Sequence, residues 1–297
     1  MTSVVVVGDV MVDVVVRVVA PFAHASDTPS SITTAPGGAA ANQAVWMARA
    51  GAQPMLVAAV GRDAFGDAAR STLSAEGVDV ALMGIADAPT GVVVALVEPD
   101  GQRSMLTDRG ANLTLRPQGV ERAAEALRDG AHLHVSGYSL FDEPSRAAGL
   151  RAIELARESG ATFSVDGCSA GPLAALGAER FLGWTQGARF LFCNVEECEV
   201  LAGPGDPAER ARTLTSGAEE VVVTLGAAGV VVVLEDGTVE RVDALSTQAS
   251  DTTGAGDAFS GTYLARRLSG ATARDALELG ALAAARCVSE PGARAWR

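Results

Sequence analysis

The residues best suited to chemistry form a run near the end of the chain, Asp251-Thr252-Thr253-Gly254-Ala255-Gly256-Asp257. A helical pattern over 254–269 begins inside this run. Small residues let a ligand approach the backbone closely, and a helix start offers free N–H groups and the positive end of the helix dipole. We therefore expect an anion site here, with Asp257 placed to accept a proton from an attacking hydroxyl group. An anion site with a base beside it is sufficient for phosphoryl transfer, in which proteins mainly position groups and stabilise charge.

A capped helix after a glycine-rich turn is the alternative interpretation of this run. For an isolated G-x-G it would be preferred. Here two aspartates and two threonines bracket the glycines, and this favours the anion site.

Three further short segments contain closely spaced glycines or polar residues: Gly37-Gly38-Ala39-Ala40-Ala41-Asn42, Asn194-Val195-Glu196-Glu197, and Thr224-Leu225-Gly226-Ala227-Ala228-Gly229. Together with the 251–257 run they resemble, in order and spacing, the four signature motifs of the ribokinase-like (PfkB) sugar and nucleoside kinases. The motifs span nearly the whole chain. The resemblance implies an ATP-dependent kinase that phosphorylates a hydroxyl of a sugar or sugar-like molecule and uses Mg²⁺.

On the phosphate side, the resemblance implies that Asp257 is the catalytic base. The N–H groups of Gly254, Ala255 and Gly256 would hold the charge developing on the γ-phosphoryl group. The resemblance also implies that Asn194 and Glu197 arrange Mg²⁺ through water and that Thr224, Gly226 and Gly229 border the nucleotide. Asp251 and Thr253, with backbone near Val288 and Gly292, would hold a monovalent cation such as K⁺.

On the acceptor side, the resemblance implies that Asp13, Gly38 and Asn42 bind hydroxyl groups. A carboxylate and an amide offer donors and acceptors in a small space, as a polyol requires. Two further candidates are Tyr138, which either stacks on a sugar or base or packs at a strand end, and Arg109. Arg109 suits a carboxylate or phosphate by bidentate pairing, but a solvated charge is the preferred interpretation.

Several of these residues also have purely structural interpretations. Asp13 could be an exposed strand charge, and Asn42 could satisfy local backbone. Asn194 and Glu197 have the spacing of a helix capping box, which is compatible with metal binding. Gly226 and Gly229 could simply mark a hairpin.

The chain also departs from ribokinases proper. Ribokinases read GGKGAN where this chain has Ala39 and Ala40, and they place a glutamate where this chain has Gly137. The sequence therefore does not support D-ribose as the acceptor.

The elements needed to position these residues follow from the hydrophobic pattern. Val4–Val7 is a continuous β-branched run, which is typical of a strand buried on both faces. After residue 110, strand-like runs and helical patterns alternate regularly. This predicts an α/β fold with a doubly wound, mostly parallel sheet flanked by helices, with ligands at the carboxyl ends of its strands. We expect residues 1–297 to form a single domain.

A small antiparallel β lid is expected from residues 11–20, 31–36 and 91–109, with a hairpin turn at Pro99-Asp100-Gly101. Apolar residues on one face of this lid (Val92, Val94 and Leu96) predict a homodimer formed through the lid.

Composition excludes other classes of function. The chain carries a formal net charge of −13 and contains no lysine, which argues against nucleic acid as a partner. Without lysine, phosphate charge must be met by backbone N–H groups, arginine and a metal ion. Charges interrupt the Val-rich N-terminal run, and no signal peptide pattern is present, so we expect no membrane association and a cytoplasmic protein with reduced cysteines. His132 and His134 are expected to be structural.

Two other functions stay open within this fold, namely a nucleoside kinase with the same motifs and a non-catalytic ligand-binding regulator. A nucleotide-dependent oxidoreductase is disfavoured because Gly8-Asp9 after the first strand lacks the G-x-G-x-x-G fingerprint.

Overall fold

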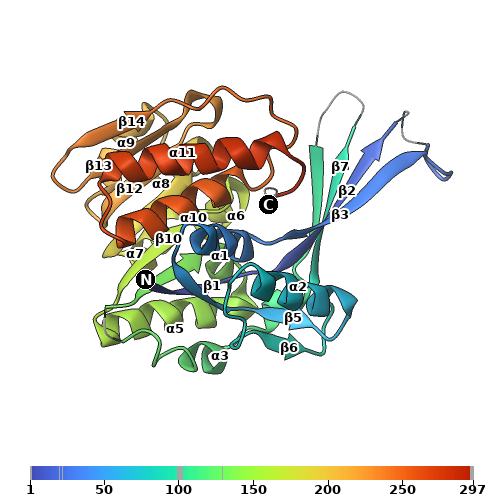
Figure 1. The fold of residues 1–297 in the computed structure, drawn as a ribbon, viewed down its shortest axis with the longest axis horizontal. Helices are drawn as coiled ribbons and strands as arrows, with labels where there is room; N and C mark the ends of the chain where they lie inside the picture. The colour runs from blue at the N-terminus through green and yellow to red at the C-terminus, as the bar shows by residue number, and fades with distance from the viewer. Residues whose placement is uncertain (1, 20, 22, 99–102, 129, 295–297) are drawn as a thin grey trace.

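A computed structural model describes residues 2–19, 21, 23–98, 103–128 and 130–294 (Figure 1). Within these residues the larger sheet has eight strands in the order β14-β13-β12-β11-β10-β9-β1-β4. Their bounds are β1 (Ser3–Val7), β4 (Gln53–Val57), β9 (His132–Ser136), β10 (Thr162–Asp166), β11 (Ala188–Asn194), β12 (Ala218–Thr224), β13 (Val230–Leu234) and β14 (Val239–Val242). The strands from β4 to β12 are parallel to their neighbours, and β13 and β14 are antiparallel. The predicted fold class is confirmed.

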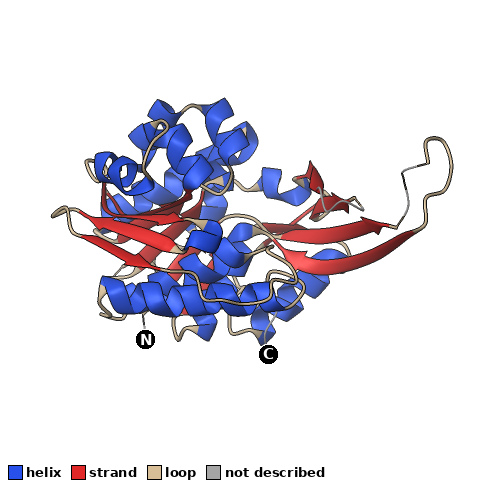
Figure 2. Cartoon of the chain, turned by 90° about the horizontal axis from the view of Figure 1, so that it is seen from above, coloured by secondary structure: helices blue, strands red, loops and turns tan. Residues whose placement is uncertain are grey.

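Helices cover both faces of this sheet (Figure 2). The alternation of side chains along β1 shows the two layers, because Val4 and Val6 belong to one buried cluster whereas Val5 and Val7 belong to the other. The first layer contains α1 (Ala39–Arg49), α2 (Ala64–Ala75), α10 (Ala255–Leu268) and α11 (Ala273–Ser289), and the second contains α3 (Pro117–Glu121), α5 (Glu143–Ser159), α6 (Ala170–Leu176), α7 (Ala178–Thr185), α8 (Val195–Ala202) and α9 (Pro207–Leu214). A strand buried on both faces requires a continuous apolar run, as found here.

The lid is a separate four-stranded sheet that projects from one side of the main body (Figure 1). Its order is β3-β2-β7-β8, with bounds β3 (Ser30–Gly37), β2 (Met11–Val18), β7 (Gly91–Val97) and β8 (Arg103–Asp108). The two outer pairings are antiparallel as expected, but β2 and β7 pair in parallel, with Asp13 opposite Val93. The expected turn at 99–101 lies outside the described residues.

Several short elements lie between the main strands and helices. After β4, the strand β5 (Ala59–Gly61) pairs with β6 (Gly84–Ala86) in a separate sheet. The short helices α4 (Tyr138–Phe141), α6 and α7 were not predicted. Gly171 lies inside α6, Gly177 separates α6 from α7, and Gly183 lies inside α7. These glycines weaken the helical pattern and hide both helices from sequence reasoning.

The structure also bears on membrane-spanning segments and on the state of the cysteines. No helix in the described part of the chain is long and apolar enough to span a bilayer. The four cysteines are free thiols, with Cys193, Cys198 and Cys287 buried and Cys168 half-buried.

Candidate functional site

The carboxyl ends of the parallel strands bring polar side chains to one edge of the larger sheet. The predicted residues Asn194 and Thr224 end β11 and β12. Two carboxylates that were not predicted lie at the same edge, since Asp9 follows β1 and Asp166 ends β10. In an open α/β sheet this edge is where ligands bind.

Four residues predicted to act on the acceptor converge beside this edge. Asn42, in the first turn of α1, donates a hydrogen bond from Nδ2 to Oδ2 of Asp257, in the first turn of α10, at 2.8 Å. The carboxyl group of Asp13 on β2 lies against Gly37, where a Cβ would come within 2.3 Å of Oδ1. Gly38 has φ 92°, and a Cβ there would lie 2.7 Å from the Asp9 carbonyl oxygen, so only glycine fits. Residues from three distant parts of the chain thus share one small space.

Burial changes the acidity of both carboxylates in this space. It raises the pKa of Asp257 well above its ordinary value, against the opposing effect of the Asn42 hydrogen bond, and nearby Asp166 and Asp9 add to the rise. Burial also raises the pKa of Asp13 to about 6, although the charge of Arg294 opposes the rise. Asp257 is therefore a stronger base than an exposed aspartate.

The glycine-rich turn before α10, where an anion site is predicted, is tightly packed on one side and open on the other. Gly254 is the N-cap of α10 with φ 77°, and a Cβ there would lie 2.3 Å from Cβ of Ala293. The N–H of Ala255 donates to the carbonyl of Thr252 at 3.3 Å, a long bond that a phosphate oxygen could replace. A Cβ on Gly256 would meet no atom within 4 Å, so this part of the turn is open.

A cavity of about 790 Å³ adjoins this turn. Six predicted residues line it: Asn194, Thr224, Gly226, Gly229, Ala255 and Gly256. Its far wall is apolar and includes Phe259, Ala281, Ala284, Ala285 and Val288. The volume suits a nucleotide-sized ligand, with small residues near the phosphates and apolar residues near a base. Among the described residues, no arginine lines the cavity, so backbone N–H groups and a cation would have to meet the charge of a bound phosphate.

Asn194 and Glu197 form the capping box that their spacing predicts. Oδ1 of Asn194 accepts from the N–H of Glu197 at 2.8 Å, and Oε2 of Glu197 accepts from the N–H of Asn194 at 2.9 Å. The structural interpretation of this pair is therefore confirmed. Glu197 is 3% exposed, and burial raises its pKa to about 8, with the charge of Asp166 contributing. Glu196, rather than Glu197, lines the cavity.

The described residues contain no group of three or more His, Cys, Asp or Glu side chains arranged to hold a metal ion. Mg²⁺ in phosphoryl-transfer sites is held by one or two carboxylates together with the substrate phosphates and water. Asn194 and Glu196 at the cavity wall, with Glu197 behind them, fit this mode of binding.

The residues predicted to hold a monovalent cation also lie together. Oδ1 of Asp251 accepts from the N–H and the hydroxyl of Thr253, at 3.0 and 2.7 Å. The N–H groups of Ser250 and Asp251 donate to the Val288 carbonyl, and that of Gly292 donates to Oδ2 of Asp251 at 3.3 Å. The 250–253 loop and the chain after α11 are therefore in contact, and their role in holding a cation stays a prediction.

Arg109 and Tyr138 are in contact with each other. The Arg109 guanidinium lies 4.5 Å above the Tyr138 ring, and it approaches Asp9 Oδ2 and Asp142 Oδ2 at 3.4 and 3.3 Å. Its side chain is 14% exposed, so the preferred interpretation as a solvated charge was wrong: two carboxylates and an aromatic face hold it in place. Tyr138 also packs edge-on against Phe141.

Several residues at the site were missed by the sequence predictions. Asp9 accepts from the N–H groups of Ala39 and Ala40 and so anchors the start of α1. Gln43 links Asp166, at 2.6 Å, to His134, at 2.8 Å. A carboxylate at the carboxyl end of a buried parallel strand, or within two residues after it, was the signal that could have found Asp166 and Asp9.

His132 and His134 are structural, as predicted. They are fully buried and bond to neighbouring hydroxyl groups of Thr162 and Ser164. Burial lowers the pKa of His134 to about 3, so its ring is neutral.

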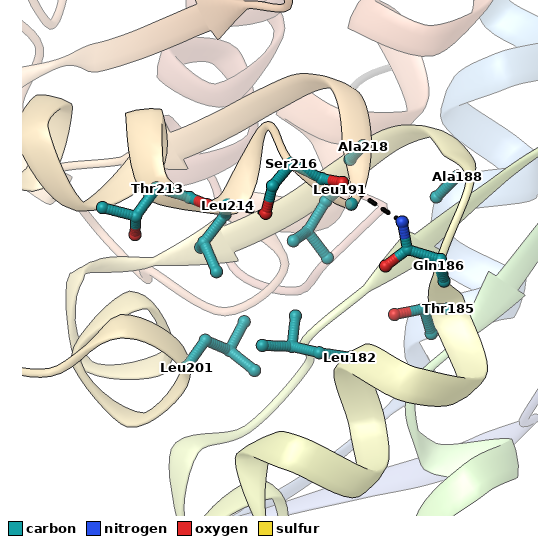
Figure 3. Close-up of a pocket in the computed structure, with 11 residues that line it drawn as sticks. Leu182, Thr185, Gln186, Ala188, Leu191, Leu201, Thr213, Leu214, Ser216 and Ala218 are labelled. Carbon is teal, nitrogen blue, oxygen red and sulfur yellow. Dashed lines mark hydrogen bonds between the residues drawn. The ribbon is translucent and has the colours of Figure 1, made fainter.

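A second, smaller cavity of about 200 Å³ lies at the other end of the sheet, beside the starts of β11 and β12 (Figure 3). Its wall contains leucines, Thr185, Thr213, Ser216 and Gln186, whose Nε2 donates to the Ser216 carbonyl at 3.1 Å. None of the lining side chains is ionisable, and the cavity offers no chemistry.

Known proteins resemble this chain in both sequence and fold. The model of the pfkB family carbohydrate kinases matches residues 1–296. Mouse ribokinase is 33% identical over 240 residues, covering 77% of this chain and 71% of that protein. The probable fructokinase-4 of Arabidopsis thaliana is 31% identical over 268 residues, covering 87% and 80%. The structure of aminoimidazole riboside kinase from Salmonella enterica, complexed with aminoimidazole riboside and an ATP analogue, superposes with a TM-score of 0.81 at 25% identity, covering 99% and 96%.

Proposed function

Because the chain belongs to the pfkB family of carbohydrate kinases, we propose that it transfers the γ-phosphoryl group of ATP to a hydroxyl group of a sugar or sugar-like acceptor. One contact in the structure supports this proposal in addition to the family membership. The Asn42–Asp257 hydrogen bond joins the acceptor residues to the first turn of the helix whose N–H groups border the nucleotide-sized cavity. This contact supports the proposal that the base and the phosphate site act together.

In the proposed reaction, Asp13, Gly38 and Asn42 hold the acceptor with one hydroxyl beside Asp257. The Asp257 carboxylate takes the hydroxyl proton, the acceptor oxygen bonds to the γ-phosphorus, and the bond from that phosphorus to the β–γ bridging oxygen breaks to leave ADP. The N–H groups of residues 254–256 stabilise the charge on the transferred group. Mg²⁺, when bound, neutralises phosphate charge, and Asn194, Glu196 and Glu197 would hold it together with water.

The direct test is an acceptor panel in which ADP release is measured with ATP, Mg²⁺ and each of a set of sugars, sugar acids and nucleosides. We expect release with at least one sugar-like acceptor. A nucleoside preference would favour the second candidate, which the similarity to a riboside kinase supports. ATP binding with no ADP release for any acceptor would indicate a non-catalytic regulator.

The raised pKa of Asp257 predicts the pH dependence of turnover. The base acts only when it is deprotonated, so kcat/KM should fall as pH drops through the pKa of Asp257. Because that pKa is raised, the fall should occur at a higher pH than the usual aspartate range near 4. A pH profile of kcat/KM, with the coupling system shown not to limit at each pH, measures it. Constant kcat/KM down to pH 4 would contradict the assignment of Asp257.

K⁺ is expected to increase turnover, because Asp251, Thr253 and the carbonyls beside Val288 and Gly292 could hold a cation next to the anion site. The measurement compares initial rates in KCl with rates at equal ionic strength of a large organic cation. Identical rates would show that no such cation is needed.

A homodimer formed through the lid is also expected. The residues on which this prediction was based, Val92, Val94 and Leu96, are half-buried within the lid sheet. Other apolar side chains of the lid are exposed instead: Ile32 is 63%, Met105 56% and Leu106 62% exposed. Light scattering coupled to size exclusion should give twice the chain mass, and Leu106→Glu should convert the dimer to monomer. A monomeric wild-type protein would remove this proposal. The single-domain organisation over residues 1–297 and the cytoplasmic location stay predictions.

A further inference from the structure

The end of the described chain is fixed against the walls of the site. Nε1 of Trp46 donates to the Ala293 carbonyl at 3.0 Å, and Nη2 of Arg49 donates to the Arg294 carbonyl at 2.9 Å. Ala293 is 1% exposed and packs against Gly254, the N-cap of α10. Arg49 is itself held by an ion pair with Glu76 at 2.8 Å. The backbone of residues 293–294 therefore has a defined place beside both α1 and α10.

The Arg294 side chain enters the acceptor space from this backbone. Its Nε donates to Oδ1 of Asn42 at 2.8 Å, and its Nη2 donates to the carbonyl of Gly37 at 2.9 Å. Gly37 is also the residue against which the Asp13 carboxyl group lies. The guanidinium thus stands among the groups expected to bind the acceptor.

These bonds determine which way the Asn42 amide points. With Oδ1 taken by a cationic donor, Nδ2 must face the carboxylate of Asp257. The reversed amide would set its N–H₂ group against the guanidinium and its oxygen against the carboxylate, and both contacts would be repulsive. The planar guanidinium also fixes the directions of both bonds, which the freely rotating ammonium group of a lysine does not.

We infer that Arg294 is a positioning residue of the active site, which orients Asn42 toward Asp257 and supplies the positive charge that faces the carboxylates of the acceptor space. The inference rests on the proposed kinase reaction. It adds a residue from outside the four sequence motifs and gives the segment after α11 a part in catalysis.

The charges around Asp257 agree with this role. Asp166 and Asp9 act to raise its pKa, whereas Arg294 and the Asn42 hydrogen bond act to lower it. Burial lowers the pKa of Arg294 itself to about 10, so it stays a cation at neutral pH. Loss of its charge should therefore leave a larger fraction of Asp257 protonated at neutral pH.

The first test is a titration of the Asp257 carboxyl group in the free enzyme, monitored by ¹³C NMR with labelled aspartate. The signal of Asp257 is identified by its absence from the spectrum of Asp257→Asn. In Arg294→Gln we expect the midpoint to rise by at least about one pH unit, the effect of losing a nearby opposite charge. Arg294→Lys, which retains the charge, should keep the midpoint close to wild type. Arg274→Gln, which removes an exposed arginine from α11, is the control and should not shift it.

The second test separates orientation from charge. Arg294→Gln should lower kcat by at least about tenfold, because a displaced reacting group can cost up to ~10²-fold. In an Asn42→Ala background the same substitution should cost much less, since the residue through which Arg294 acts is gone.

An unchanged Asp257 midpoint in Arg294→Gln together with equal losses of kcat in both backgrounds would overturn the inference. If Arg294→Gln does not fold, Arg294→Lys still tests the orientation, because kcat must fall while the midpoint holds. The titration requires no turnover, whereas failure of the proposed reaction would be seen in the wild-type acceptor panel.

Discussion

Replacement of Asp257 by asparagine is expected to lower kcat at least ~10²-fold, the contribution of a positioned general base. Asparagine has nearly the same shape, and its side-chain oxygen can still accept the 2.8 Å hydrogen bond from Asn42. It cannot take up the hydroxyl proton at neutral pH. The site should therefore keep its geometry and lose its base.

The measurement is kcat with the preferred acceptor, beside ATP affinity by calorimetry, which should change little. Asp275→Asn is the matched control, because Asp275 lies in the first turn of α11 as Asp257 lies in the first turn of α10, but is exposed. Turnover of Asp257→Asn within a few-fold of wild type would remove the residue from the role of base.

The second large effect is expected from Gly254→Ala. Gly254 is left-handed, with φ 77°, and an added Cβ would lie 2.3 Å from Cβ of Ala293. Left-handed backbone costs an alanine roughly 1–2 kcal/mol, and the clash must in addition move the start of α10 or the segment that carries Arg294. Displacement of the N–H groups of residues 254–256 should lower kcat ~10²-fold or more, the usual cost of losing one oxyanion donor.

Gly270→Ala provides the matched control for this substitution. Gly270 also has positive φ, 95°, but a Cβ there would meet nothing within 4 Å, and the residue lies beyond the far end of α10. It should lose stability by about the backbone cost alone, seen as a lower Tm, and keep its kcat. Equal kcat in the two variants would show that the start of α10 does not hold the transferred group.

Much of the site follows from the sequence because its residues lie in short motifs with local physical meaning. A glycine-rich turn before a helix predicts an anion site wherever the helix lies, and the Asn194–Glu197 spacing predicts a capping box that the structure contains. The parallel sheet was predictable from its buried β-branched runs. That fold alone brings the ends of β11 and β12 to one edge.

Other parts depend on contacts between distant segments and leave little local signal. The parallel pairing of β2 with β7 is set by how the chain crosses the molecule between residues 18 and 91. Arg294 lies in no motif, and its position depends on Trp46 and Arg49 on a helix that is 245 residues or more away in sequence. The enclosure of Arg109 likewise required Asp9 and Asp142 to meet it.

The most direct test of the proposed reaction is a structure with ADP, Mg²⁺, aluminium fluoride and the acceptor chosen by the panel. We expect the planar fluoride within about 3 Å of the N–H groups of residues 254–256, with an acceptor oxygen in line and within the same distance of an Asp257 carboxylate oxygen. A fluoride bound away from the start of α10, or an acceptor hydroxyl that points away from Asp257, would contradict it.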